Sequence, residues 1–223
     1  MWRWKVTAEI ASYLKNGCVL GLDSSREMIE LAKKKFPYKD YSNLTFQIRD
    51  VRELEYNEKF DLVFSNAALH WIKNHIIVLK TIQRSLKLGG RVLIQMGGQG
   101  NARDVIKVVD EIIIEKKWSY YFKDFEFPYG FYGPDEYREW LKEANLQPLR
   151  VELKSKVMIQ KGIDGLKAWI RTTWLPYTQR IPKKLQEDFV DEIVGRYLKN
   201  NPLNDGGLVR VDMMRLEVEA IKK

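Results

Sequence analysis

The sequence predicts an α/β fold with a parallel, doubly wound sheet. Short apolar runs alternate with helical patterns along the first half of the chain, as strand–helix–strand units do. The runs CVLGLD and LTFQIRD each close on an aspartate, Asp23 and Asp50. With 223 residues, 45% of them hydrophobic, the chain is long enough for one domain with a full core. Right-handed crossovers in such a sheet place a binding site at the carboxyl ends of the strands.

The elements of the first half follow from apolar periodicity and from stop signals. Ser24 or Ser25 can cap a helix that breaks at Pro37, and Gly89-Gly90 ends a later helix. The run FDLVFSN is nearly all apolar, as expected of a parallel strand buried on both faces. The expected order is helix 7–14, strand 18–23, the capped helix, strands 44–50 and 60–66, helix 72–87 and strand 91–96.

The second half of the chain differs in composition from the first, because it contains an aromatic, proline-containing loop, SYYFKDFEFPYGFYGP. It shows no internal repeat, no low-complexity tract and no linker long enough to separate two folding units. We therefore expect a single domain over residues 1–223 with a helical cap inserted near the C-terminus. The expected elements are helices 102–118 and 135–144, strand 147–159, helices 163–175 and 183–199, and strand 208–221.

Composition excludes several classes of protein. The formal charge of +8 suggests nucleic-acid binding, but 38 basic residues are scattered among 30 acidic ones, so a solvated basic surface is favoured and nucleic acid is unlikely as a partner. One cysteine, Cys18, and two histidines make neither a disulfide nor a metal site, so no metal is expected. No apolar run approaches the roughly 20 residues of a membrane span. We expect a cytoplasmic protein without a membrane partner.

The two strand-end acids have a chemical reason for their positions. An aspartate after one strand can accept both hydroxyls of a ribose, and an aspartate after the next can accept an adenine amino group. Asp23 and Asp50 fit these roles, and Met28 is placed to cover an adenine face. The alternative is that each acid only caps the helix that follows it.

The order and spacing of three segments carry a family resemblance. VLGLDSSREMIELAKKKF, FDLVFSNAALHWI and LKLGGRVLIQM resemble the second, fourth and fifth strand segments of class I S-adenosylmethionine (SAM) dependent methyltransferases, which have a Rossmann-like fold. Trans-aconitate methyltransferases are the most similar group, and juvenile-hormone-acid methyltransferases are related. The resemblance extends to GLKAWIRTTWLPYTQRIP and RLEVEA near the C-terminus. It divides the chain into a cofactor-binding part (1–118), a substrate cap and loop region with one strand (119–206) and a final strand (207–223).

The resemblance implies a SAM site at the strand ends. It assigns the ribose to Asp23 and the adenine amino group to Asp50. The remaining cofactor contacts that it implies are Ser24 and Met28 along the adenosine, Val51 against the ring, and Asn66 and Ala67 beside the methionine portion and the sulfonium.

The resemblance also implies residues on the substrate side. His70 is the catalytic candidate and Trp71 faces the substrate, although His70 can equally be a hydrogen bonder at a helix start and Trp71 a core residue. In the cap, Trp169 and Tyr177 are substrate candidates. Arg171 either holds a substrate carboxylate with its planar fork or points to solvent.

One departure from the family is large. The family has a first strand that runs into a glycine-rich loop, whereas this chain begins MWRWKVTAEI, and KVTAEI matches the helix after that loop. If Arg3 is encoded by AGA, the codons from Met1 into Lys5 read one base later encode Cys-Gly-Asp-Gly, so we expect a frame-shifted remnant of the loop. Loss of the strand predicts two facing strand edges that are unpaired, unless the two strands pair directly or another segment or chain fills the gap. It also predicts weaker cofactor binding and self-association through those edges.

The function implied by the resemblance is transfer of a methyl group from SAM to an oxygen of a small carboxylic acid, with S-adenosylhomocysteine as the product. A carboxylate needs no strong base to accept a methyl group, which suits a chain with two histidines. The alternative is a non-catalytic binding protein that keeps the scaffold. An RNA methyltransferase, which only the charge suggests, is less favoured.

Overall fold

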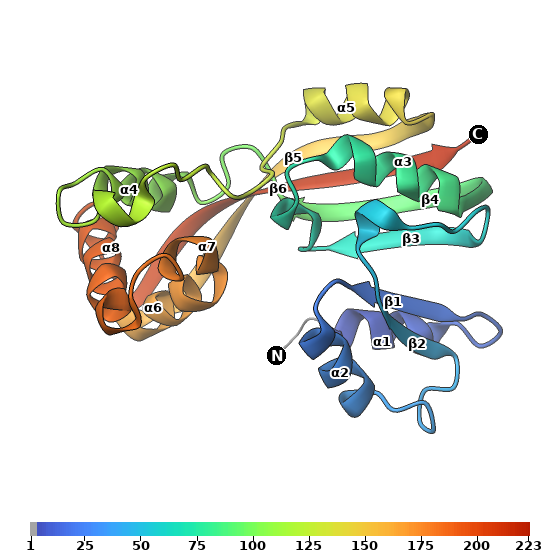
Figure 1. The fold of residues 1–223 in the computed structure, drawn as a ribbon, viewed down its shortest axis with the longest axis horizontal. Helices are drawn as coiled ribbons and strands as arrows, with labels where there is room; N and C mark the ends of the chain where they lie inside the picture. Colours follow the sequence, from blue (N-terminus) through green and yellow to red (C-terminus); the bar gives the residue numbers. More distant parts are fainter. Residues whose placement is uncertain (1–3) are drawn as a thin grey trace.

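The computed structural model describes residues 4–223, so the expectation for Met1–Arg3 lies outside the described residues (Figure 1). Each predicted helix and strand is present, with ends that differ by a few residues. The elements are α1 (Lys5–Tyr13), β1 (Val19–Asp23), α2 (Arg26–Lys35), β2 (Leu44–Ile48), β3 (Phe60–Asn66), α3 (His75–Ser85), β4 (Leu86–Gly97), α4 (Arg103–Ile113), α5 (Pro134–Glu143), β5 (Leu146–Lys161), α6 (Gly162–Thr173), α7 (Leu175–Thr178), α8 (Gln186–Asn200) and β6 (Leu208–Lys222).

The strands of the described chain form two separate sheets. β1 and β2 pair in parallel, and a second sheet has the order β3-β4-β6-β5, in which β4 runs parallel to β3 and β6 runs antiparallel to both of its neighbours. Figure 1 shows β1 next to β3, but no ladder of hydrogen bonds joins them. Within the described residues, the facing edges of β1 and β3 are therefore both unpaired, so the two strands do not pair directly with each other.

The expectation that strand 60–66 is buried on both faces is wrong. Leu62 and Phe64 are 45% and 41% exposed. Among residues 4–223, β3 pairs only with β4, and α3 and α5 cover one face of its sheet while Leu62 and Phe64 remain exposed. An apolar composition indicates an inner strand only where neighbouring elements are present to bury it.

The covered face of the four-stranded sheet forms one core. Val78 and Leu79 of α3 and Tyr137 and Leu141 of α5 are fully buried against the sheet. α3 begins later than predicted, because the Asn74 side chain caps it by accepting a hydrogen bond from the Ile77 N–H. This core fixes the end of β4, which borders the site described below.

The β1–β2 unit has a small core of its own, formed with α1 and α2. Gly21 of β1 lies under two aromatic rings, because a Cβ built there would lie 2.6 Å from the ring of Phe46 and 2.8 Å from the indole of Trp4. The Trp4 and Phe46 rings meet edge to face at 4.9 Å. Trp4, directly before α1, thus closes this core.

A helical lobe lies beside the sheets. Figure 1 shows α4, α6, α7 and α8 around the far halves of β5 and β6, which extend well past β3 and β4. Trp118, Tyr177 and Phe189 are fully buried in the lobe. α6, α7 and α8 lie between β5 and β6 in the chain, at the position predicted for an inserted helical segment.

Candidate functional site

A cavity of about 290 Å³ lies at the carboxyl ends of β3 and β4, where they meet the helical lobe. Its floor comes from the carboxyl ends of β3 and β4 and from inner residues of β5 and β6, and its aromatic wall comes from the loop before α5 and from α6. None of its lining side chains is an aspartate or glutamate. The lining includes Asn66, Ala67, His70, Gln95, Gly97, Asn101, Tyr129, Phe131, Lys156, Trp169, Trp174, Met213 and Arg215.

The chain turns sharply at the end of β3. Ala67 has a left-handed backbone with a φ of 53°, which costs about 1 kcal/mol or more for a residue other than glycine. Its N–H donates to the Gln95 backbone carbonyl at 2.8 Å, and the Gln95 side-chain Nε2 donates to the side-chain Oδ1 of Asn66 at 2.7 Å. These bonds hold Asn66 and Ala67 at the cavity.

His70 is oriented by the end of β4. Its Nδ1 accepts a hydrogen bond from the Gly97 N–H at 3.3 Å. An N–H group can only donate, so the neutral ring carries its proton on Nε2 and offers a donor there. The ring also packs near Trp71 and Phe131, at 5.6 and 5.9 Å between centroids.

Gly97 is needed for the close approach of the cavity walls. A Cβ at this position would lie 2.7 Å from the Asn101 amide nitrogen and 2.9 Å from the Phe131 ring. The side-chain Oδ1 of Asn101 in turn accepts a hydrogen bond from the Met214 backbone N–H at 3.1 Å, which joins the loop after β4 to β6. A side chain at Gly97 would push these elements apart.

The acid after β1 makes a local contact and keeps one oxygen unused. Asp23 Oδ1 accepts the Ser25 N–H at 2.9 Å, and no donor within residues 4–223 reaches Oδ2. Ser25 rather than Ser24 caps α2, because its Oγ accepts the Met28 N–H at 3.2 Å. Met28 is half-buried and Ser24 is exposed.

The acid after β2 is more heavily engaged. Asp50 caps a 3₁₀ turn, η1 (Val51–Glu53), by accepting the Arg52 N–H at 2.9 Å, and it also accepts the Arg52 Nε–H at 3.0 Å. The Arg52 hydrogen bond lowers the pKa of Asp50. The Val51 carbonyl accepts the Thr81 hydroxyl at 2.7 Å, which ties this turn to α3. For Asp50 the capping role is thus real, alongside any ligand role.

The four predicted substrate residues differ in their surroundings. Trp169 lines the cavity. Trp71 packs on Tyr129 at 5.3 Å, and Tyr177 is fully buried with its ring 4.6 Å from that of Phe125. Neither Trp71 nor Tyr177 is part of the cavity lining.

Arg171 lies outside the cavity lining. Its Nε–H donates to Glu187 at 2.8 Å and its Nη2 also pairs with that carboxylate, while its side chain is 42% exposed. The planar fork is therefore engaged at the surface of the lobe. The solvent-facing alternative matches this geometry.

His75, which was not among the site residues predicted from the sequence, is buried and makes hydrogen bonds next to the turn that carries His70. Its Nδ1 accepts the Tyr137 hydroxyl at 2.5 Å, and its Nε2–H donates to the Ile72 and Leu69 carbonyls at 2.8 and 3.0 Å. Burial lowers the pKa of His75, which favours the neutral ring that this pattern requires. The result ties the turn that carries His70 to α5.

The sequence also missed Lys156 and Arg215, the two cations of the cavity. Alternation along strand 208–221 places Arg215 on the same face as Glu217 and Glu219, but nothing local shows which face borders a site. Only the pairing of β5 with β6 brings Lys156 and Arg215 together.

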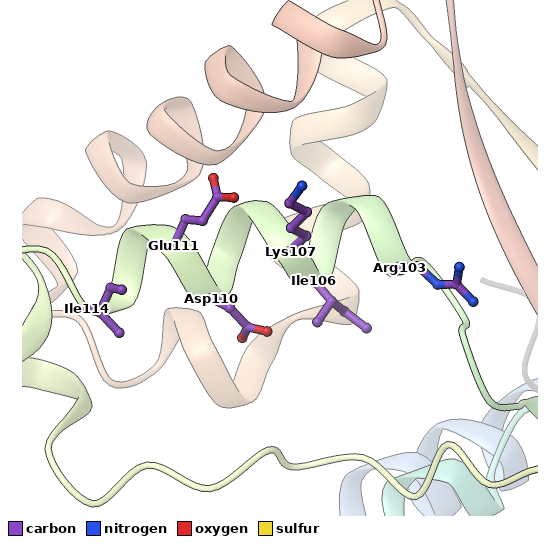
Figure 2. Close-up of a pocket in the computed structure, with 6 residues that line it drawn as sticks. All are labelled: Arg103, Ile106, Lys107, Asp110, Glu111 and Ile114. Carbon is purple, nitrogen blue, oxygen red and sulfur yellow. The ribbon is translucent and has the colours of Figure 1, made fainter.

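A second hollow, of about 470 Å³, lies along α4. All of its lining side chains come from Arg103–Ile114, and Figure 2 shows them spreading along the helix without converging on a point. Its charged residues are two cations, Arg103 and Lys107, followed along the helix by two acids, Asp110 and Glu111. It is a weaker candidate site than the cavity.

Two further features are not found among residues 4–223. No cluster of histidine, cysteine, aspartate or glutamate there could hold a metal ion. Nor does this part of the chain contain a helix with the length and apolar character needed to cross a membrane.

Comparison with known proteins identifies the fold. The family model described as "Methyltransferase domain" matches residues 5–145. An uncharacterized methyltransferase of Schizosaccharomyces pombe is 29% identical over 223 residues, which covers 98% of this chain and 82% of the relative. A trans-aconitate 2-methyltransferase of Deinococcus radiodurans is 28% identical over 194 residues, which covers 85% of this chain and 73% of that enzyme.

Solved structures agree with this comparison. A candidate methyltransferase of Bacillus halodurans superposes with a TM-score of 0.64 at 14% identity, covering 97% of this chain and 88% of the other. A phosphoethanolamine N-methyltransferase of Haemonchus contortus, solved with S-adenosylhomocysteine, gives 0.54 at 18% identity and covers 96% of this chain and 46% of the other. The resemblance read from the sequence is confirmed, and the chain belongs to the methyltransferase domain family.

Proposed function

We propose that this chain transfers the methyl group of SAM to an oxygen of a small carboxylic acid. The observation that carries the proposal is the position of the cavity, directly past the end of β3 and on the strand-end edge that also bears Asp23 and Asp50. In parallel α/β sheets, ligands bind at this edge. The Deinococcus relative, whose name states that it methylates trans-aconitate, supports a carboxylic acid as acceptor.

The donor and acceptor groups of the chain suit the adenosine end of SAM. Asp23 Oδ2 has no partner among the described residues and can accept from a ribose hydroxyl. Met28 is half-buried beside it on α2 and can cover a ring. Asp50 would have to share its carboxylate between Arg52 and an adenine amino group, so its contribution is smaller.

The methionine end of SAM is less well matched. Where the family has a glycine-rich loop with free backbone N–H groups, the described chain has Trp4, whose indole packs on Gly21 and Phe46. The Trp4 indole N–H is buried without an acceptor. We propose that this replacement weakens SAM binding without removing the adenosine contacts.

On the acceptor side, the chain positions the substrate and excludes water. SAM, when bound, supplies an activated methyl group, so an ionised carboxylate needs alignment rather than deprotonation. The aromatic wall formed by Tyr129, Phe131, Trp169 and Trp174 shields the cavity. His70 also lines the cavity, and the Gly97 N–H fixes the orientation of its ring.

The divided sheet favours a second candidate function. With no ladder between β1 and β3, the two halves of the SAM site sit on separate sheets, as in a binding protein that keeps the scaffold and has lost catalysis. Such a protein would bind a carboxylic acid in the cavity but turn over no SAM.

Incubation with SAM labelled in its methyl group and a panel of mono-, di- and tricarboxylic acids tests the proposal. We expect label in an acid-derived ester that is released by mild base, the property of a carboxyl methyl ester. Label in no acid, together with binding of an acid in the cavity, would favour the non-catalytic candidate. Label in added RNA would contradict both.

A further inference from the structure

We propose that Arg215, assisted by Lys156, is the group that recognises a carboxylate of the acceptor. This inference rests on the proposed function for the identity of the acceptor, but carboxylate binding can be measured without methyl transfer. It assigns the binding of a substrate carboxylate to residues of β6 and β5, whereas the sequence suggested Arg171 for this role.

The strand register places both cations at the cavity. Arg215 pairs across the ladder with Lys154, and Lys156 pairs with Met213, so all four residues share one face of the β5–β6 ribbon. Arg215 and Lys156 line the cavity, whose lining side chains include no acidic residue. An anion in the cavity therefore meets two positive groups and no carboxylate.

Arg215 has donor capacity that the described residues leave unused. Its Nη2 pairs with Glu217 Oε1 at 2.5 Å, but its buried Nε–H has no acceptor. A guanidinium has five N–H donors, and an unmet buried donor is unfavourable. A ligand carboxylate that moved the side chain slightly toward the cavity could meet these donors.

Glu217 positions Arg215 without using all of its donors. The same carboxylate also accepts from Arg150 Nη1 at 2.5 Å and from Lys154 Nζ at 3.0 Å. Burial alone would raise the pKa of Glu217, yet the hydrogen bonds from Lys154 and Arg150 outweigh it and hold that pKa at about 2. Glu217 thus divides its hydrogen bonds among three cations, of which Arg150 also lies near Glu152 and Glu219 and Lys154 also pairs with Glu152, whereas Glu217 is the carboxylate that pairs with Arg215.

Lys156 is the second positively charged side chain that lines the cavity. No carboxylate among residues 4–223 forms an ion pair with it, and its side chain is exposed at the cavity mouth. The cavity volume of about 290 Å³ corresponds to roughly ten water molecules. The ligand that fits both the charge and the size is a small acid with at least two carboxylates, one to receive the methyl group and one for Arg215.

Arg171 supplies a matched control because it is also an arginine with a carboxylate partner, Glu187, but lies outside the cavity lining. Isothermal titration of trans-aconitate into the full chain would compare wild type, Arg215→Gln, Lys156→Gln and Arg171→Gln. Trans-aconitate trimethyl ester serves as the uncharged probe. Thermal melting of each variant checks folding, and Arg215→Lys keeps a charge beside Glu217 in case Arg215→Gln does not fold.

We expect Arg215→Gln to weaken trans-aconitate binding about tenfold or more, because a charge-assisted bidentate contact is lost. Arg215→Lys should retain part of the affinity, Lys156→Gln should weaken binding about threefold, and Arg171→Gln should leave it unchanged. The trimethyl ester should bind more weakly than the acid to wild type and equally to wild type and Arg215→Lys.

Three results would overturn the inference. The first is that wild type binds no carboxylic acid, and the second is that wild type and Arg215→Lys bind trans-aconitate equally well. The third is that the Arg215 and Arg171 variants lose equal affinity for trans-aconitate. Methyl transfer to an uncharged acceptor with no effect of Arg215 would also overturn it, while leaving the chain a methyltransferase. Carboxylate binding that depends on Arg215 but brings no methyl transfer would support the inference and contradict the proposed catalysis.

Discussion

The Nδ1 of His70 accepts a hydrogen bond from the Gly97 N–H at 3.3 Å, and this contact joins the turn after β3 to the end of β4. It sets both the direction of the ring and the position of its proton, because the neutral form must then carry hydrogen on Nε2. Gly97 has no room for a side chain, so the two strand ends approach closely only with glycine there. Because Nδ1 is already engaged as an acceptor, we assign His70 the role of a hydrogen-bond donor rather than a base.

Substitution of His70 tests this assignment. His70→Phe keeps an aromatic ring but removes the donor, and we expect kcat/KM for methyl transfer to fall about tenfold or more. His70→Gln should retain more activity, because its amide can still donate. Steady-state kinetics with varied acid acceptor measure the effect. A general base would give equal losses for both variants and a rate that rises steeply with pH through the neutral range.

The small core of the β1–β2 unit should be sensitive to volume. Gly21→Ala places a methyl group 2.6 Å from Phe46 and 2.8 Å from Trp4, and we expect it to lower the free energy of unfolding by about 1–3 kcal/mol. Gly195→Ala in α8 is the control, since a Cβ there has nothing within 4 Å and alanine favours a helix. Urea unfolding compares them. Equal stability of wild type and Gly21→Ala would show that Trp4 does not pack there.

Stability should depend on pH through His75. Burial lowers its pKa below the ordinary 6.5, against the pull of the Ile72 and Leu69 carbonyls. The unfolded chain therefore takes up a proton at a higher pH than the folded chain. The contribution of neutral His75 to the free energy of unfolding is therefore complete above pH 6.5. It is lost as the pH falls from 6.5 through the pKa of His75 in the folded chain.

His75→Gln cannot titrate and should show a smaller loss of unfolding free energy between about pH 7.5 and pH 5.5 than wild type. His70→Gln, which changes the other histidine of the chain, should keep the His75 component. Urea unfolding at both pH values gives the comparison. The explanation fails if wild type and His75→Gln lose the same unfolding free energy between these two pH values.

The open edge of β3 should promote self-association. Its unpaired backbone groups lie beside Leu62 and Phe64, which are 45% and 41% exposed. We expect association to increase with concentration and to be reduced by Phe64→Lys, but not by Ile114→Lys, which changes a residue 76% exposed on the helical lobe. Sedimentation velocity measures this. Wild type that stays monomeric at every concentration would refute the expectation.

The positions of helices and strands were predictable because they depend on local periodicity and local stop signals. The exposure of β3 was not, since FDLVF has the same composition whether or not a strand lies beside it. Burial of a strand depends on neighbours that are distant in sequence.

The site divides in the same way. Asn66, Ala67 and His70 lie at or just after the end of β3, and the family resemblance of the segment FDLVFSNAALHWI indicated them as site residues. Arg215 and Lys156 come together only through the long pairing of β5 with β6, and local sequence does not encode that register. Arg171 was ambiguous for the same reason, because its direction depends on Glu187 in another helix.

The central claim is that the strand-end acids hold the adenosine of SAM, and titration of S-adenosylhomocysteine into the purified chain tests it most directly. We predict saturable binding that Asp23→Ala weakens by about 1.5–3 kcal/mol, as expected for charge-assisted hydrogen bonds to a ribose. Asp61→Ala is the control, since Asp61 is an exposed acid of β3 that pairs with Lys87. No binding by wild type, or equal binding by wild type and Asp23→Ala, would contradict the account.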